Sequence, residues 1–211
     1  ELLLGHGIAS AAVDAEGVRL ALDDGRVVQG DHVLVAIGLV PETSLARDAG
    51  LELDPRNGGI AVAHDGRTSD PHVFAAGDCA EAFDKVSGKT IVSAIQPNAS
   101  EQARIAATNM VAFARGKPAQ ADLSGVTQIN VLGTLGLVSA SFGDWQGKPG
   151  HDHVELTDKA TGRHLSLRFQ DDVMVGCNAV GWTEHIGVMR GLVEGQIKLG
   201  EWKDKLMQDP T

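Results

Sequence analysis

The most constraining feature of this sequence is a short apolar run that stops at the dipeptide Gly77-Asp78. Residues 73–76 read Val-Phe-Ala-Ala, and a turn segment from Thr68 to Pro71 precedes them. A continuous apolar run between turn signals is typical of a fully buried parallel strand. The carboxyl ends of such strands are where open α/β sheets bind nucleotides. The residues alone leave two interpretations open: Asp78 accepts hydrogen bonds from ligand hydroxyls, or it caps a turn.

A longer pattern around this dipeptide resembles a known signature. Residues 68–78 carry Thr-Ser-x-Pro-x-x-Phe-Ala-Ala-Gly-Asp, which resembles the second flavin-binding signature of the pyridine nucleotide-disulfide oxidoreductase superfamily. Residues 31–43 resemble the segment where such chains leave the NAD(P)H domain and re-enter the FAD domain, although Leu39 and Glu42 replace the usual arginine and asparagine. The resemblance implies that Asp78, with the glycine before it, binds the ribityl chain of FAD.

A long helix is predicted over residues 98–115. Asn98 and Glu101 form a capping-box pattern at its start, and Gly116 follows its last residue. An apolar stripe at helical spacing is expected to face the interior, formed by Ile105, Met110, Val111 and Ala114.

The start of this helix is the second candidate site. A helix N-terminus carries unpaired N–H donors and a partial positive charge. The resemblance implies that Pro97, Asn98 and Ala99 face the pyrimidine edge of the flavin, where this charge favours the anionic reduced form. Without the resemblance, the same residues read as the start of an ordinary capped surface helix.

The remaining pattern changes character near residue 118. Before it, short strands and one short helix are predicted, the strands at 8–13, 18–22, 27–28, 33–37 and 59–62 and the helix at 44–49. After it, strands dominate and helices follow, with strands at 128–131, 136–142, 153–157, 164–169 and 173–180 and a helix at 183–199. Residues 165–193 are similar to the C-terminal interface domain of rubredoxin and ferredoxin reductases, and to the flavin portion of the NADH-linked nitrite reductase large subunit.

These features predict an α/β nucleotide-binding remnant followed by an α+β C-terminal interface domain. Residues 1–42 would be the end of an NAD(P)H-binding domain, 43–118 the C-terminal half of an FAD-binding domain, and 119–211 an interface or dimerisation domain. No Gly-x-Gly-x-x-Gly follows a predicted strand. Since the family implies two such phosphate-binding turns, we expect both upstream and expect this chain to be the C-terminal part of a longer polypeptide.

Composition narrows the partners and the compartment. A net charge of −10 argues against nucleic acid and anionic membrane, and the apolar runs are too short to span a bilayer. Two isolated cysteines, Cys79 and Cys177, indicate a reducing cytoplasm. Cys79 is expected to be a packed residue rather than a redox thiol. His151 and His153 are expected to form a surface pair rather than a metal site.

The resemblance implies an FAD-dependent NAD(P)H oxidoreductase that passes electrons from NAD(P)H through FAD to an acceptor. The acceptor would be a small redox protein or a small molecule, and the chain alone is expected to be inactive. No catalytic residue and no metal ligand is assigned to it. The alternative is a non-catalytic binding or dimerisation module that keeps a flavoprotein-like fold, and formation of a homo-oligomer is left open.

Overall fold

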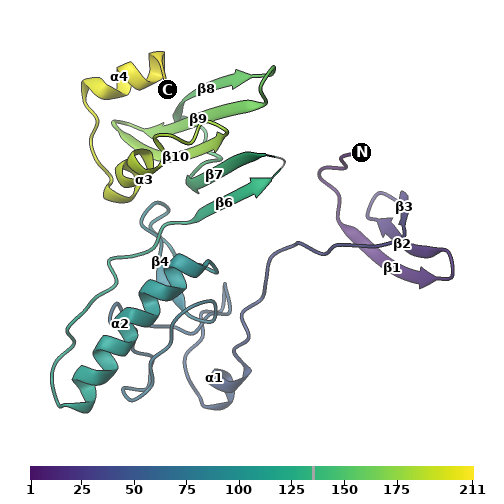
Figure 1. The fold of residues 1–211 in the computed structure, drawn as a ribbon. Helices are drawn as coiled ribbons and strands as arrows, with labels where there is room; N and C mark the ends of the chain where they lie inside the picture. Colours follow the sequence, from purple (N-terminus) through teal and green to yellow (C-terminus); the bar gives the residue numbers. More distant parts are fainter. Residues whose placement is uncertain (135) are drawn as a thin grey trace. The chain divides into compact units, whose positions relative to one another are not determined.

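The computed structural model describes residues 1–134 and 136–211 (Figure 1). The chain divides into two compact units, Glu1–Leu39 and Val40–Thr211. The domain boundaries at residues 42 and 118 stay a prediction.

The first unit is a three-stranded antiparallel sheet in the order β1-β2-β3. Its strands are Ile8–Asp14, Gly17–Leu22 and Val27–Gly30, so the predicted hairpins are confirmed. Both connections are short; Gly17 directly follows the first, and Gly25 lies in the second. Among the described residues of this unit, Leu22 alone is buried.

The strand predicted at residues 33–37 is wrong. The structure assigns no strand to this segment, and Leu34 and Ile37 are 92% and 86% exposed. An apolar run becomes a buried strand only when neighbouring strands bind its backbone on both sides. Within the described residues, no strand pairs with this run.

The second unit begins with helix α1, Ser44–Asp48, close to the predicted helix. The strands predicted at 59–62 and 73–76 are wrong, because each reduces to single bridging residues. Ile60 bridges Leu53 and Ala80, while Phe74 bridges Arg67. Turns connect these bridges, so the segment is a compact irregular layer rather than part of a parallel sheet.

A two-stranded sheet of β4 (Glu81–Phe83) and β5 (Thr90–Val92) leads into helix α2, Gln96–Ala114. The predicted N-cap is wrong, because Ile95 is the N-cap residue and Asn98 lies inside the first turn. Pro97 can occupy that turn because its nitrogen needs no hydrogen-bond acceptor there. Glu101, the predicted capping-box partner of Asn98, instead pairs with Arg104 at 2.6 Å.

The buried face of α2 differs from the predicted apolar stripe. Met110 and Val111 are 51% and 50% exposed, whereas Ile105 is buried as predicted. The side chains that face the interior recur at helical spacing and include three amides; they are Asn98, Gln102, Ile105, Ala106, Asn109 and Ala112. The buried face of α2 therefore offers amide groups for hydrogen bonds to neighbouring segments as well as apolar side chains for packing.

The C-terminal part contains a five-stranded antiparallel sheet in the order β6-β7-β10-β9-β8. All five predicted strands are confirmed, as Ile129–Thr134, Leu137–Gly143, Asp152–Asp158, Arg163–Gln170 and Val173–Val180. The predicted terminal helix is shorter than expected, because α3 covers Ile186–Gly195 and Gln196 adopts a left-handed conformation. Helix α4, Glu201–Gln208, follows.

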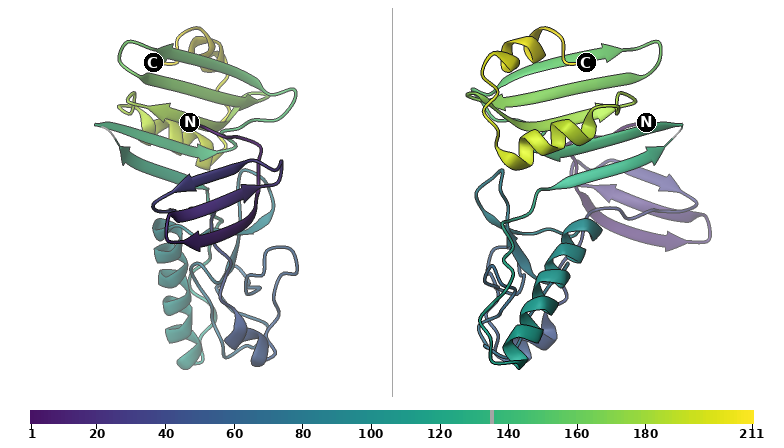
Figure 2. Two further views of the ribbon diagram at one scale, coloured as in Figure 1. Left: turned by 90° about the vertical axis from the view of Figure 1, so that its right-hand side faces the viewer. Right: turned by 60° about the vertical axis from the view of Figure 1, so that its left-hand side comes forward.

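One face of this sheet supports the main apolar core, and α3 packs along it (Figure 2). Alternate residues of β9, namely Leu165, Leu167 and Phe169, point into this core, as expected for a strand with one buried face. Phe142 and Cys177 are directly opposite each other on neighbouring strands and are both fully buried.

Candidate functional site

The Gly77-Asp78 dipeptide forms a tight turn. Ala80 donates its backbone N–H to the carbonyl of Gly77 at 3.0 Å, which places Asp78 and Cys79 at the tip. Asp78 is exposed, so its carboxylate remains accessible to a ligand. Gly77 has a φ of 86°, a conformation that a residue with a Cβ rarely adopts. The glycine is therefore required by the shape of the turn.

The start of α2 offers backbone donors. Its first intrahelical hydrogen bond runs from the N–H of Ala99 to the carbonyl of Ile95, at 3.0 Å. The N–H groups of Gln96 and Asn98 therefore have no intrahelical acceptor, and Pro97 has no N–H. Among the described residues, no side chain caps this end. The end consequently keeps its partial positive charge and free donors.

The structure brings these two predicted segments together. A Cβ built on Gly77 would lie 3.6 Å from the Cβ of Ala99. The Gly77 N–H donates to Oε1 of Gln102 at 2.7 Å, one turn further along the same helix. The Asp78 carboxylate and the free donors at the start of α2 therefore belong to one region of the molecule.

Asn98 does not offer its side chain to this region. It is buried, and its Nδ2 donates to Oγ of Ser93 at 2.7 Å and to the carbonyl of Thr127 at 3.1 Å. Only the backbone of Asn98 can serve a ligand. Sequence reasoning missed these partners and missed Gln102, because an amide at a helical position normally indicates an exposed face.

The donor set suits a flavin. An exposed carboxylate accepts hydrogen bonds from hydroxyl groups of a polyol, and uncapped helical N–H groups donate to carbonyl oxygens. Gly77 and Ala99, which lie next to each other, are both small and leave room for close approach. The residues present therefore fit the ribityl chain and ring edge of FAD.

The two thiols are in different environments. Cys79 is half-buried beside Asp78, and its Sγ lies 3.6 Å from the carbonyl of Ala76. Cys177 is fully buried in the C-terminal core, and burial raises the pKa of its thiol to about 12. The thiolate is the reactive form of cysteine. Burial both shields Cys177 from reagents and disfavours its thiolate, so Cys79 is the thiol that we expect to react in the folded protein.

We therefore expect iodoacetamide to alkylate Cys79 in the folded chain and to modify Cys177 only after unfolding. Peptide mass spectrometry of samples taken over time measures both rates. The same labelling in denaturant is the control, since both thiols should then react alike. Equal rates for the two thiols in the folded chain would contradict the buried position of Cys177.

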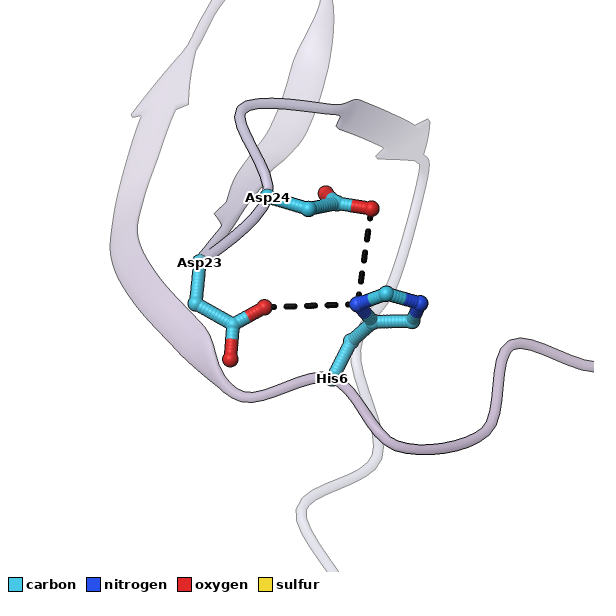
Figure 3. A group of neighbouring side chains, drawn as sticks. All are labelled: His6, Asp23 and Asp24. Carbon is cyan, nitrogen blue, oxygen red and sulfur yellow. Dashed lines mark hydrogen bonds and ion pairs between the residues drawn. The ribbon is translucent and has the colours of Figure 1, made fainter.

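A separate polar cluster lies in the first unit, where His6 faces Asp23 and Asp24 (Figure 3). The His6 Nδ1 lies 3.4 Å from a carboxylate oxygen of each aspartate. The same Oδ2 of Asp24 already accepts from Nε of Arg26 at 2.6 Å. The backbone N–H of Arg26, and then its guanidinium, also lower the pKa of Asp24. The cluster is therefore an exposed ion-pair network that already holds a cationic side chain.

Comparisons with known proteins define the family. The model of the pyridine nucleotide-disulphide oxidoreductase family matches residues 1–107, about half of the chain. The chain belongs to this family, as the sequence resemblance predicted, and the family consists of oxidoreductases.

Two curated relatives and one solved structure illustrate the match. The chain is 36% identical over 161 residues to the nitrite reductase [NAD(P)H] large subunit of Klebsiella oxytoca, covering 73% of this chain and 16% of that protein. It is 46% identical over 83 residues to the nitric oxide reductase FlRd-NAD(+) reductase of Klebsiella pneumoniae, covering 39% and 20%. An FAD-dependent pyridine nucleotide-disulphide oxidoreductase from Desulfovibrio vulgaris has the same fold, with a TM-score of 0.76, 24% identity and coverage of 98% and 53%.

The aligned residues make up only about a fifth or less of these two curated relatives. Within the described residues, none of the helices has the length and apolar character needed to cross a bilayer.

Proposed function

We propose that this chain forms the ribityl and ring-edge part of an FAD site in an NAD(P)H-dependent oxidoreductase. The observation that carries the proposal is the contact between the Gly77-Asp78 turn and the uncapped start of α2. Membership of the family supports the cofactors, and the names of the relatives refer to NAD(+) and NAD(P)H.

Each residue of the site has a proposed role. Asp78 accepts hydrogen bonds from the ribityl hydroxyls, and Gly77 allows the turn to approach the ligand closely. The backbone N–H of Asn98 donates toward the pyrimidine edge. Pro97 and Ala99 present little side chain and keep that end of the helix open. The bound flavin would supply the hydride chemistry, and the chain would supply position and electrostatic field.

The whole protein would take electrons from NAD(P)H and pass them to a redox protein or a small molecule. The similarity to the nitric oxide reductase FlRd-NAD(+) reductase supports a protein acceptor. The chain alone is proposed to be inactive, because it carries no glycine-rich phosphate-binding turn. Homo-oligomer formation through residues 119–211 also remains a proposal. A non-catalytic module with this fold is the alternative.

Riboflavin binding tests the proposed flavin site directly, because riboflavin contains the ring and the ribityl chain but no phosphate. We expect riboflavin to shift the amide NMR signals of Gly77, Asp78 and Ala99 in the isolated chain. FAD should bind with an affinity within about threefold of riboflavin, since the proposed site contacts only the part that the two ligands share. Replacing Asp78→Ala should weaken binding about tenfold or more, as loss of a charged acceptor implies.

The matched control is Asp70→Ala, which removes a different exposed aspartate from the preceding turn. This variant should bind riboflavin like the unchanged chain. Shifts that spread over the C-terminal sheet, or an Asp78→Ala variant that binds as well as the control, would overturn the proposed site.

A further inference from the structure

Gln102 is a buried polar residue of α2 whose side chain contacts the backbone of the proposed site. It is 5% exposed, and its Oε1 accepts the Gly77 N–H at 2.7 Å. The two residues lie 25 positions apart in the chain, so this hydrogen bond connects separate segments. It joins the second turn of α2 to the residue immediately before Asp78.

Backbone hydrogen bonds flank the Gly77-Asp78 turn, but none of them engages the Gly77 N–H. The strand predicted to lead into it is absent, and among the described residues Phe74 forms a single bridge, with Arg67. Before the turn, the N–H of Ala75 donates to the carbonyl of Gly66 at 3.0 Å. Beyond it, Ile60 donates to the carbonyl of Cys79 at 2.8 Å and accepts the N–H of Glu81 at 3.1 Å. The Gly77 N–H is thus fixed by one side chain, where a regular parallel sheet would fix it through a neighbouring backbone.

The rest of the Gln102 amide does not contribute a hydrogen bond. Its Nε2 is buried and has no partner among the described residues. The side chain borders a cavity of about 10 Å³ together with Ala75 and Ile105. A buried unpaired donor lowers stability, so an apolar residue would suit this position better if packing were its only role. The role that distinguishes glutamine here is the acceptor for Gly77.

We infer that Gln102 is a positioning residue for the flavin site, which holds the Gly77-Asp78 turn at a fixed distance from the start of α2. The inference rests on the proposed function for the identity of the ligand. The hydrogen bond sets where the backbone of Gly77 lies, and hence where the Asp78 carboxylate meets a ligand bound at the helix start. Loss of the bond leaves the Gly77 N–H without its acceptor and loosens the turn at that residue, without removing any group that contacts the ligand.

The test compares Gln102→Met, which removes the acceptor at similar size, with Gln102→Glu, whose carboxyl oxygen still accepts in either protonation state. We expect the Gly77 amide of the methionine variant to exchange with solvent on the order of tenfold faster in the isolated chain. The glutamate variant should keep its protection. Met110→Leu, on the exposed face of α2, is the control, and the Leu167 amide reports whether the C-terminal sheet is unchanged.

Riboflavin titration adds a functional measurement. Gln102→Met should weaken binding about three- to tenfold, as expected for a misplaced binding group, and Gln102→Glu should restore it. Unchanged exchange at Gly77 in Gln102→Met would overturn the inference, as would faster exchange in both variants. If the unchanged chain shows no riboflavin shifts, the proposed function fails, while the exchange data still decide whether Gln102 holds the turn.

Discussion

Replacing Gly176→Ala is expected to destabilise the C-terminal sheet by about 3 kcal/mol or more. Gly176 lies inside β10, and a Cβ there would lie 2.4 Å from both the carbonyl carbon and the oxygen of Asp144. It would also lie 2.6 Å from the nitrogen of Trp145. These are backbone atoms, and the Asp144 N–H is bound to the carbonyl of Val175 at 2.8 Å. The segment cannot move away without breaking that bond.

Urea unfolding followed by tryptophan fluorescence measures this effect, because Trp145 directly follows the clashing residue. The matched control is Gly187→Ala in α3, where a Cβ meets nothing within 4 Å. That variant should gain about 0.5–1 kcal/mol, since alanine loses less conformational entropy than glycine in a helix. Similar unfolding midpoints for the two variants would contradict the close contact at Gly176.

The strands of the second half could be predicted because each carries its own signal. In β9, apolar residues alternate with polar ones, and the turns on either side are rich in glycine and aspartate. Three of the four pairings in this sheet join consecutive strands, whose partners are nearby in sequence, and the exception is the pairing of β7 with β10. Local pattern and pairing therefore agree.

The apolar runs of the first half gave the opposite result. Residues 33–37 and 73–76 have the composition of buried parallel strands, but parallel pairing requires partners that are distant in sequence. Among the described residues no strand provides that pairing. Composition predicts that a segment is suited to burial. It does not supply the neighbours that would bury it.

The candidate site was predictable in its backbone but not in its supporting contacts. Gly77, Asp78, Pro97 and Ala99 follow from a turn signal, a helix start and the family resemblance. Gln102 does not, because a glutamine at a helical position normally indicates an exposed face. The apolar stripe expected on α2 followed this rule, and the structure instead buries amides that bind distant backbone groups.

Asn109 gives the largest expected effect on α2. It is 1% exposed and makes four hydrogen bonds with the backbone. Its Nδ2 donates to the carbonyls of Asp65 and Ala121, and its Oδ1 accepts the N–H groups of Gln120 and Ala121. It thereby fixes two loops to the helix. Asn109→Ala would leave all of these backbone groups without their partner.

We expect Asn109→Ala to cost about 3–4 kcal/mol, since four modest hydrogen bonds are lost and buried groups become unsatisfied. Asn109→Asp tests the cause, because it keeps the shape but replaces the donor with an oxygen facing two carbonyls. Its cost should be as large at neutral pH. Asn130→Ala, at an exposed position of β6, should change stability by less than about 0.5 kcal/mol.

Far-UV circular dichroism during urea unfolding follows α2 in these variants, and amide exchange at Gln120 and Ala121 reports the local effect. Both amides should exchange faster in Asn109→Ala and Asn109→Asp, because Oδ1 no longer holds them in the first and the repelled carboxylate shifts away in the second. A stability of Asn109→Asp within 1 kcal/mol of the unchanged chain, a limit of about one hydrogen bond, would show that the donor contacts contribute little. The contribution of Asn109 would then come from its Oδ1, which accepts the N–H groups of Gln120 and Ala121.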